Sequence, residues 1–374
     1  MSLRGDIMLC KFKVKGYKCF DKEIELDLEK HNDYQFNKSM IKNGIINKAI
    51  IYGKNGSGKT NMGLAIFDIM FHLTDKNRNM EPIISQNYIN MDSKHKYVDF
   101  YYEFLINNDR IIYKYGKESL YKIVYEEVIY NGKVIINYDY SNPGKREINI
   151  EEAKNLNFKY NDEDISIVKY ICNNTILKED NPLSELMDFV NGMLWFRSVD
   201  FNGFIGFRNT SNSLDNIIID NNKLKEFSQF LIDNDINYNL TEIKFPTGKV
   251  IGVKKENGIT TFKSIASSGT LALWLYYCWE IYFDKITFLF IDEFDATYHF
   301  ELAANIVRRL NDKTNFQTIL TSHNTYLMSN KLTRPDCTFI IDNNFIRNLS
   351  SCTEKELREA HNIEKLYREG AFID

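Results

Sequence analysis

Hydrophobic and polar positions alternate over two stretches of the chain, and each stretch predicts antiparallel strands. The first lies near the N-terminus around a turn at Gly16, and residues 49–52 add a short, wholly apolar strand. The second covers 97–140, is rich in Tyr, Phe, Ile and Val, and has turn signals at 107–109 and 131–132. Turns of this kind between alternating runs predict a meander of β-hairpins.

Helical spacing predicts the other half of the fold. A glycine-rich turn after 49–52 leads into an expected helix over 61–72. Residues 150–235 change character, so we expect a mainly helical insertion with helices over 184–195 and 222–232. The remainder predicts a hairpin over 242–262, followed by helices and strands in alternation, and such alternation indicates a parallel sheet. In chain order we expect a helix over 270–283, a strand over 287–292, a helix over 300–310, a strand over 317–320, a strand over 338–342 and a helix over 354–369.

The composition is that of a globular protein. Lys+Arg 47 against Asp+Glu 51 leaves a net charge of -4 over 374 residues, a length typical of two or three packed units. The net charge therefore gives no support for a protein that coats nucleic acid, although a local basic patch could still bind it. The six cysteines form no close pair and the histidines none at metal-ligand spacing, so we expect a reducing cytoplasm and no zinc site. Because no apolar run approaches ~20 residues, we expect no membrane segment.

Residues 53–60 (GKNGSGKT) fit the P-loop pattern, between a short apolar strand and a helix. Glycines let backbone N–H groups wrap phosphates, and the helix N-terminus adds its dipole. Lys59 would provide a point charge for the β- and γ-phosphates, and the Thr60 hydroxyl could bind Mg²⁺. A strand–helix turn that binds nothing is the simpler alternative. The further residues expected around the phosphates are Gly53, Asn55, Gly56, Ser57, Gly58 and Asn61.

A second motif, 288–293 (FLFIDE), is an apolar strand that ends in two acids. This position would let Asp292 hold Mg²⁺ and Glu293 orient and deprotonate an attacking water. Solvated acids at a strand end are the alternative, and the upstream P-loop argues against it.

Two further sequence segments, by their order and spacing, indicate which class of P-loop protein this is. Residues 266–270 (ASSGT) begin a predicted helix before Asp292, and His323 follows the strand 317–320. A helix N-terminus with serine and glycine amides can bind the γ-phosphate of a nucleotide held on a second subunit. Taken alone, the first is a generic turn and the second a structural histidine.

These segments, with the opening FKVKGYKCF, FLFIDEFDATYH and LTSHN, resemble the ABC-type ATPases of the RecF/SMC/OLD branch. The most similar group is the short AAA15-class ATPases of bacterial antiphage and abortive-infection systems. The ending HNIEKLYREGAF also resembles ATPase subunits of two-gene systems of the RloA and PARIS type, which are paired with a separate Toprim-like effector. The resemblance covers essentially the whole chain outside 150–235.

The resemblance implies an α/β fold, an ABC-type P-loop ATPase head with a mixed sheet, an antiparallel β subdomain and a helical insertion. We expect the N-terminal half of the head over 8–149, the insertion over 150–235, and the C-terminal half, with the signature and the switch histidine, over 236–374. The implied ligands are ATP and Mg²⁺.

Roles carried over from the group fall on matching positions. Lys59 and Thr60 match the phosphate and Mg²⁺ contacts, and Asp292 matches the metal ligand. Glu293 corresponds to the catalytic base and His323 to the switch. The remaining matches are Ser267 and Gly269 of the trans signature and Asp295, the D-loop acid. Gln86 is our candidate for the Q-loop residue near the metal, with an ordinary loop residue as the alternative.

The chain also departs from the group. Ala266, Ser268 and Thr270 replace the usual signature residues, and Phe300 stands where proline is frequent, which could slow turnover. Only 51 residues follow His323, fewer than the Toprim domain of OLD nucleases needs, so we expect any nuclease on another polypeptide. The region between P-loop and signature lacks the heptads of an SMC arm.

We therefore expect a cytoplasmic ATP-hydrolysing switch that forms a homodimer or higher oligomer and controls a separate, Toprim-like effector. Expected docking surfaces are 150–235 and the basic-striped tail 354–372, with an apolar ridge in the first; helices that only complete the protein's own core, and a solvated tail, are the alternatives. A RecF-like DNA-repair ATPase is the alternative function, and a transporter subunit fits less well. The residues of the ridge are Leu186, Phe189, Leu194 and Phe196.

Overall fold

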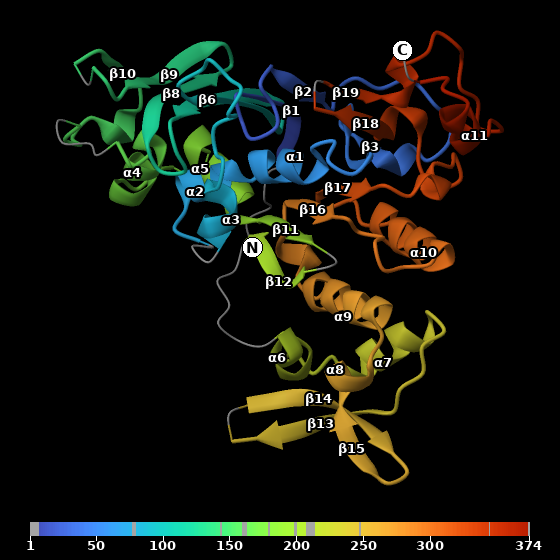
Figure 1. The fold of residues 1–374 in the computed structure, drawn as a ribbon. Coiled ribbons are helices and arrows are strands. Elements are labelled where there is room, and N and C mark those ends of the chain that lie inside the picture. Colours follow the sequence, from blue (N-terminus) through green and yellow to red (C-terminus); the bar gives the residue numbers. More distant parts are fainter. Residues whose placement is uncertain are drawn as a thin grey trace.

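The computed structural model places two large sheets side by side with helices between and around them (Figure 1). No helix within its described residues is long and apolar enough to cross a membrane. The described residues are 7–76, 80–142, 144–158, 163–178, 180–197, 200–206, 214–246, 248–343 and 345–372.

The first sheet is antiparallel throughout and contains the predicted meander. Strand β6 alternates strictly and buries every second side chain against the helices. Asn107 and Asn131 adopt positive φ at the hairpin turns, as the sequence predicted. In spatial order the strands are β10 (Arg146–Ile148), β9 (Lys133–Asp139), β8 (Ile123–Tyr130), β7 (Asp109–Lys117), β6 (Val98–Ile106), β1 (Ile7–Lys15) and β2 (Ile24–Asp27).

The second sheet is mixed, with parallel inner strands and antiparallel edges, so the predicted fold class is confirmed. Its inner strands are buried on both faces because helices cover each side. In order they are β12 (Asp200–Gly206), β11 (Met193–Arg197), β16 (Phe288–Asp292), β17 (Gln317–Ser322), β5 (Lys48–Tyr52), β18 (Thr338–Asp342) and β19 (Phe345–Asn348).

Eleven α-helices appear among the described residues, and two small sheets complete the fold. One small sheet, β13 (Leu240–Phe245), β14 (Gly248–Lys255) and β15 (Gly258–Thr261), extends the predicted hairpin by a strand and projects away from the two large sheets (Figure 1). The other is β3 (Ile41–Lys42) and β4 (Ile45–Ile46). The helices are α1 (Lys59–Ile66), α2 (Asp68–Leu73), α3 (Glu81–Ser85), α4 (Ile167–Asn174), α5 (Pro182–Asn191), α6 (Leu214–Asp220), α7 (Leu224–Ile232), α8 (Phe262–Ile265), α9 (Ser268–Glu280), α10 (Phe300–Asn311) and α11 (Ile363–Arg368).

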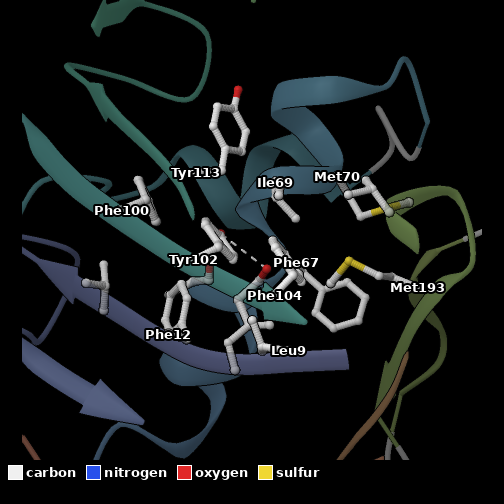
Figure 2. Packing of buried hydrophobic residues seen from close by; sticks show 14 of the residues in the cluster. Leu9, Phe12, Phe67, Ile69, Met70, Phe100, Tyr102, Phe104, Tyr113 and Met193 are labelled. Carbon is white, nitrogen blue, oxygen red and sulfur yellow. Dashed lines mark hydrogen bonds between the residues drawn. The ribbon is translucent and has the colours of Figure 1, made fainter. Parts of the chain in front are cut away.

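Helices α1 and α2 connect the two large sheets. Gly63 of α1 lies so close to β16 that an added Cβ would come within 2.6 Å of the Phe290 ring. On the other side, the hydroxyl of Tyr102 donates to the carbonyl of Ala65 at 3.0 Å. Figure 2 shows the aromatic side chains of β1 and β6 packed toward Phe67, in the turn between the helices. The phosphate-loop helix is therefore packed against both sheets.

A group of charged side chains is buried beneath α2. Asp68 accepts hydrogen bonds from Lys117 Nζ at 2.8 Å and from the hydroxyls of Tyr88 and Tyr115. The side chains of Asp68 and Lys117 are both 0% exposed. A buried charge is tolerated where partners of this kind replace water.

Four predicted features of the secondary structure need correction. The helix expected over 61–72 breaks at Phe67 into α1 and α2, and the tail is helical only over α11. The helix expected over 184–195 ends at Asn191, where the chain turns into β11. Because β11 pairs with β16, the segment 150–235 adds a strand to the central sheet and is more than a helical insertion. The prediction of an apolar docking ridge is wrong too, because its four side chains are all buried: Leu186, Phe189, Leu194 and Phe196.

Candidate nucleotide-binding site

The P-loop connects β5 to α1, as predicted, and its glycines are sterically required. Gly58 has φ 97°, and a Cβ there would come within 2.8 Å of the Phe20 ring. A Cβ on Gly53 would come within 2.8 Å of the carbonyl oxygen of Ile341. Gly56 also has positive φ. With its amide nitrogen turned to the loop, Asn343 donates at 3.3 Å to carbonyls of the loop. The backbone amides are thus presented by a tightly packed loop.

Lys59 begins α1 and folds back over the loop. Its ammonium donates to the carbonyls of Gly53 at 2.7 Å and Lys54 at 3.0 Å. Burial lowers the pKa of Lys59, and the nearby carboxylates, Asp292 first, work against that shift. The ammonium is therefore held where phosphate oxygens can replace these carbonyls.

Asp292 ends β16 and lies against the helix that follows the P-loop. The Thr60 hydroxyl donates to Asp292 Oδ2 at 2.8 Å, and the Thr321 hydroxyl donates to Oδ1 at 2.7 Å. Burial raises the pKa of Asp292, while these two hydrogen bonds and Arg197 oppose the shift. Two residues separated by 232 positions thus meet, as the sequence motifs predicted.

Glu293 is held in an unusual conformation beside this pair. Its φ is 50°, in the left-handed region, which for a non-glycine residue costs of order 1–3 kcal/mol. Its backbone N–H donates to the Thr321 hydroxyl at 2.8 Å. Arg197 donates to Glu293 Oε1 at 2.8 Å. The strained backbone and these two contacts fix where the carboxylate lies.

Asp295 and His323 lie next to each other at the end of β17. Ser322 donates its hydroxyl to Asp295 Oδ2 at 2.8 Å. Burial raises the pKa of Asp295, and the neighbouring His323 is among the groups that oppose this shift. His323 itself is exposed, so its ring is accessible to a ligand or a second chain.

Ser267 and Gly269 lie at the exposed N-terminus of α9. The Ser267 hydroxyl caps the helix by accepting from the Thr270 N–H at 3.2 Å. A Cβ on Gly269 would come within 2.9 Å of the Thr297 carbonyl, two residues after Asp295. Among the described contacts, these signature residues meet Thr270 and Thr297 and not the chain's own P-loop.

Gln86 lies beside the P-loop as well. It follows α3, and its carbonyl accepts from Lys18 Nζ at 2.6 Å. Gln86, Lys18 and Asn61 line an open cleft of about 610 Å³ together with Cys19, which accepts from Asn61 at 3.0 Å. The metal-ligand role of Gln86 stays a prediction.

Two residues of this site, Arg197 and Thr321, were not predicted from the sequence. Arg197 is the register partner of Asp292 on the neighbouring parallel strand, with its Nε 3.6 Å from Asp292 Oδ2. Thr321 stands two residues before His323 in LTSHN, so an inward-facing position on that strand was a usable signal. For Arg197 the only signal was the apolar run before it, assigned there to a helix.

The donor chemistry of the site fits Mg²⁺. Asp292 and Thr60 offer a carboxylate and a hydroxyl at the C-terminal end of the P-loop. These are hard oxygen ligands of the kind that Mg²⁺ uses in phosphate-binding sites, where it keeps several waters.

The P-loop after β5, together with Asp292 and Glu293 at the end of the neighbouring strand β16, is the arrangement typical of P-loop nucleotide-binding proteins. A family model described as "AAA domain, putative AbiEii toxin, Type IV TA system" matches residues 48–329. The chain belongs to this family, AAA_21. Among curated proteins, none matches the chain.

Several solved structures are similar to the chain at low identity. The SMC head domain from Thermotoga maritima is 14% identical, with a TM-score of 0.42, 91% of this chain covered and 98% of that one. The Smc head domain from Pyrococcus furiosus, bound to the C-terminal domain of ScpA, is 14% identical with a TM-score of 0.43. The match covers 91% of this chain and 95% of that one. The recombination mediator protein RecF with ATP is 14% identical with a TM-score of 0.40, and the match covers 92% of this chain and 100% of that one.

Proposed function

We propose that this protein is an ATP-hydrolysing switch. The observation that carries the proposal is the meeting of the P-loop with the acids of β16, above all the Thr60–Asp292 hydrogen bond. Bound Mg²⁺ would neutralise phosphate charge during the reaction, and Thr60 and Asp292 would hold it. The loop amides and Lys59 bind the phosphates, and Glu293 accepts a proton from the attacking water.

We further propose that two copies complete the site. Ser267 caps α9 at the protein surface, and its hydrogen bonds among the described residues stay within its own helix. An exposed helix N-terminus attracts phosphate through its free N–H groups and its dipole. In the dimer, each P-loop faces the signature of the other chain, and Asp295 and His323 lie beside the shared nucleotide.

The first experiment separates binding from hydrolysis. Glu293→Gln should lower ATP turnover at least ~100-fold, because it removes the base, while ATP binding persists and a nucleotide-loaded dimer accumulates in size-exclusion light scattering. Lys59→Ala should weaken ATP binding itself. Glu301→Gln, an exposed residue of α10, is the matched control. Wild-type turnover in the Glu293 variant would refute the catalytic assignment.

The cellular role we propose is in a bacterial antiphage system, where the ATPase controls a separately encoded effector, expected to be a Toprim-like nuclease. The family description, which names a putative toxin of a type IV TA system, supports a defence role. Co-expression with the neighbouring gene and a pull-down in each nucleotide state tests it. No complex in any state, or nuclease activity from this chain alone, would contradict the proposal. ATP-dependent DNA binding that weakens steeply with salt would favour the RecF-like alternative.

A further inference from the structure

Arg197 connects the predicted catalytic base to a strand that the motifs do not include. Its Nη2 lies 2.8 Å from Glu293 Oε1, and its Nε lies 3.6 Å from Asp292 Oδ2. The parallel register of β11 and β16 pairs Arg197 with Asp292, so the guanidinium is placed between two adjacent carboxylates by the sheet itself. Its position is therefore a consequence of the central fold.

We propose that Arg197 is a phosphate-responsive latch. Its guanidinium pairs with the Glu293 carboxylate, and when ATP binds it would move to the terminal phosphate and free Glu293 to accept a proton from water. This inference rests on the proposed ATPase function and adds a ligand-binding and regulatory residue to it.

The contacts would let Arg197 leave Glu293 for a phosphate, while Asp292 stays in place. Asp292 is fully buried and held by two hydroxyl donors, so it stays in place if the guanidinium leaves. The side chains of Glu293 and Arg197 are 28% and 35% exposed, so their pair opens toward solvent. Partial exposure makes an ion pair weak enough to be replaced by a more highly charged partner.

The chemistry favours the exchange in the presence of ATP. A carboxylate oxygen that accepts from a guanidinium is not available at that lone pair to accept a proton from water. A terminal phosphate offers more negative charge than one carboxylate and suits the planar, multiply donating guanidinium. Because ADP lacks that phosphate, the latch should respond to ATP and much less to ADP.

Nucleotide affinities test the latch independently of turnover. We would measure dissociation constants for a non-hydrolysable ATP analogue and for ADP, each with Mg²⁺, by calorimetry. Arg197→Ala should weaken the ATP analogue by about 10–100-fold and ADP by less than about 3-fold, and Arg197→Lys should recover part of the loss. Arg309→Ala, which breaks the ion pair with Glu280 on α9, is the matched control and should change neither.

A double-mutant cycle with Glu293→Gln then isolates the latch. With Arg197 present, Glu293→Gln should tighten the ATP analogue several-fold, because the guanidinium no longer has to leave a carboxylate. In the Arg197→Ala background the same change should have no effect. An unchanged ratio of ATP to ADP affinity in both Arg197 variants, or tightening that persists without Arg197, would overturn the latch. If the wild type binds neither nucleotide, the proposed function itself fails.

Discussion

Replacing Asp68 by Asn should destabilise the protein strongly although the site lies outside the nucleotide motifs. Asp68 and Lys117 form an ion pair with both side chains 0% exposed. The substitution keeps the size of the side chain and removes its charge, so the ammonium of Lys117 is left in the core without a counter-charge. Removing one partner of a buried pair costs about 3–5 kcal/mol.

Two details of the structure place the expected loss near the lower end of this range. Burial lowers the pKa of Lys117, and Asp68 opposes that shift; without Asp68 the lysine can give up its proton. An asparagine oxygen can also still accept from Tyr88, which now donates to Asp68 at 2.7 Å. At roughly 2–4 °C per kcal/mol for a cooperative unit of 150–250 residues, a loss of about 3 kcal/mol lowers Tm by about 6–12 °C.

Thermal unfolding of a matched set would measure the effect. Glu118→Gln breaks the exposed pair Lys122–Glu118 in the turn between β7 and β8 and should leave Tm unchanged. Lys117→Met should also destabilise, and the double variant with Asp68→Asn should lose clearly less than the sum, because no unpaired charge remains. A Tm shift under about 2 °C for Asp68→Asn, or strictly additive losses, would refute this account of the buried pair.

Two further predictions concern the P-loop and the acid limit of stability. Gly58→Ala should abolish measurable ATP binding because its Cβ would meet Phe20, whereas Gly132→Ala, with similar positive φ and open space, should lose about 1–2 kcal/mol of stability and keep its ATP affinity. Burial lowers the pKa of His72, with Glu126 opposing the shift, so the unfolded chain gains the proton first. Stability should therefore fall as pH drops below about 6.5, less so in His72→Gln, as Tm against pH would reveal.

The sequence could predict those parts of the site that lie in contiguous segments. The P-loop and the acids after 288–291 each combine a local conformation with the residues that use it, and the order of the segments predicted that they meet. Arg197 could not be predicted in this way, because it reaches Glu293 across 96 positions through the pairing of β11 with β16. The four apolar residues before Arg197 fit a buried strand as well as a helix, and the pairing in the sheet decides between them.

The buried charges beneath α2 were beyond prediction for a related reason. Alternation in 97–140 predicted the antiparallel hairpins, but it gave Lys117 no partner. That partner, Asp68, comes from a helix whose own pattern, read as one continuous helix over 61–72, did not reveal the break at Phe67. Local periodicity predicts which side of an element is buried, and only the packing of distant elements determines what meets there.

The order of strands in the mixed sheet also has a consequence for the order of synthesis. All seven strands of the antiparallel sheet precede residue 149, so that sheet has its complete set of strands while most of the chain is still to be made. The P-loop strand β5 has to wait, because both of its neighbours, β17 and β18, come more than 260 residues later. A growing chain therefore carries its phosphate-binding loop from the start without a sheet to hold it. We therefore expect the ability to bind nucleotide only after β17 and β18 have been made and have inserted beside β5.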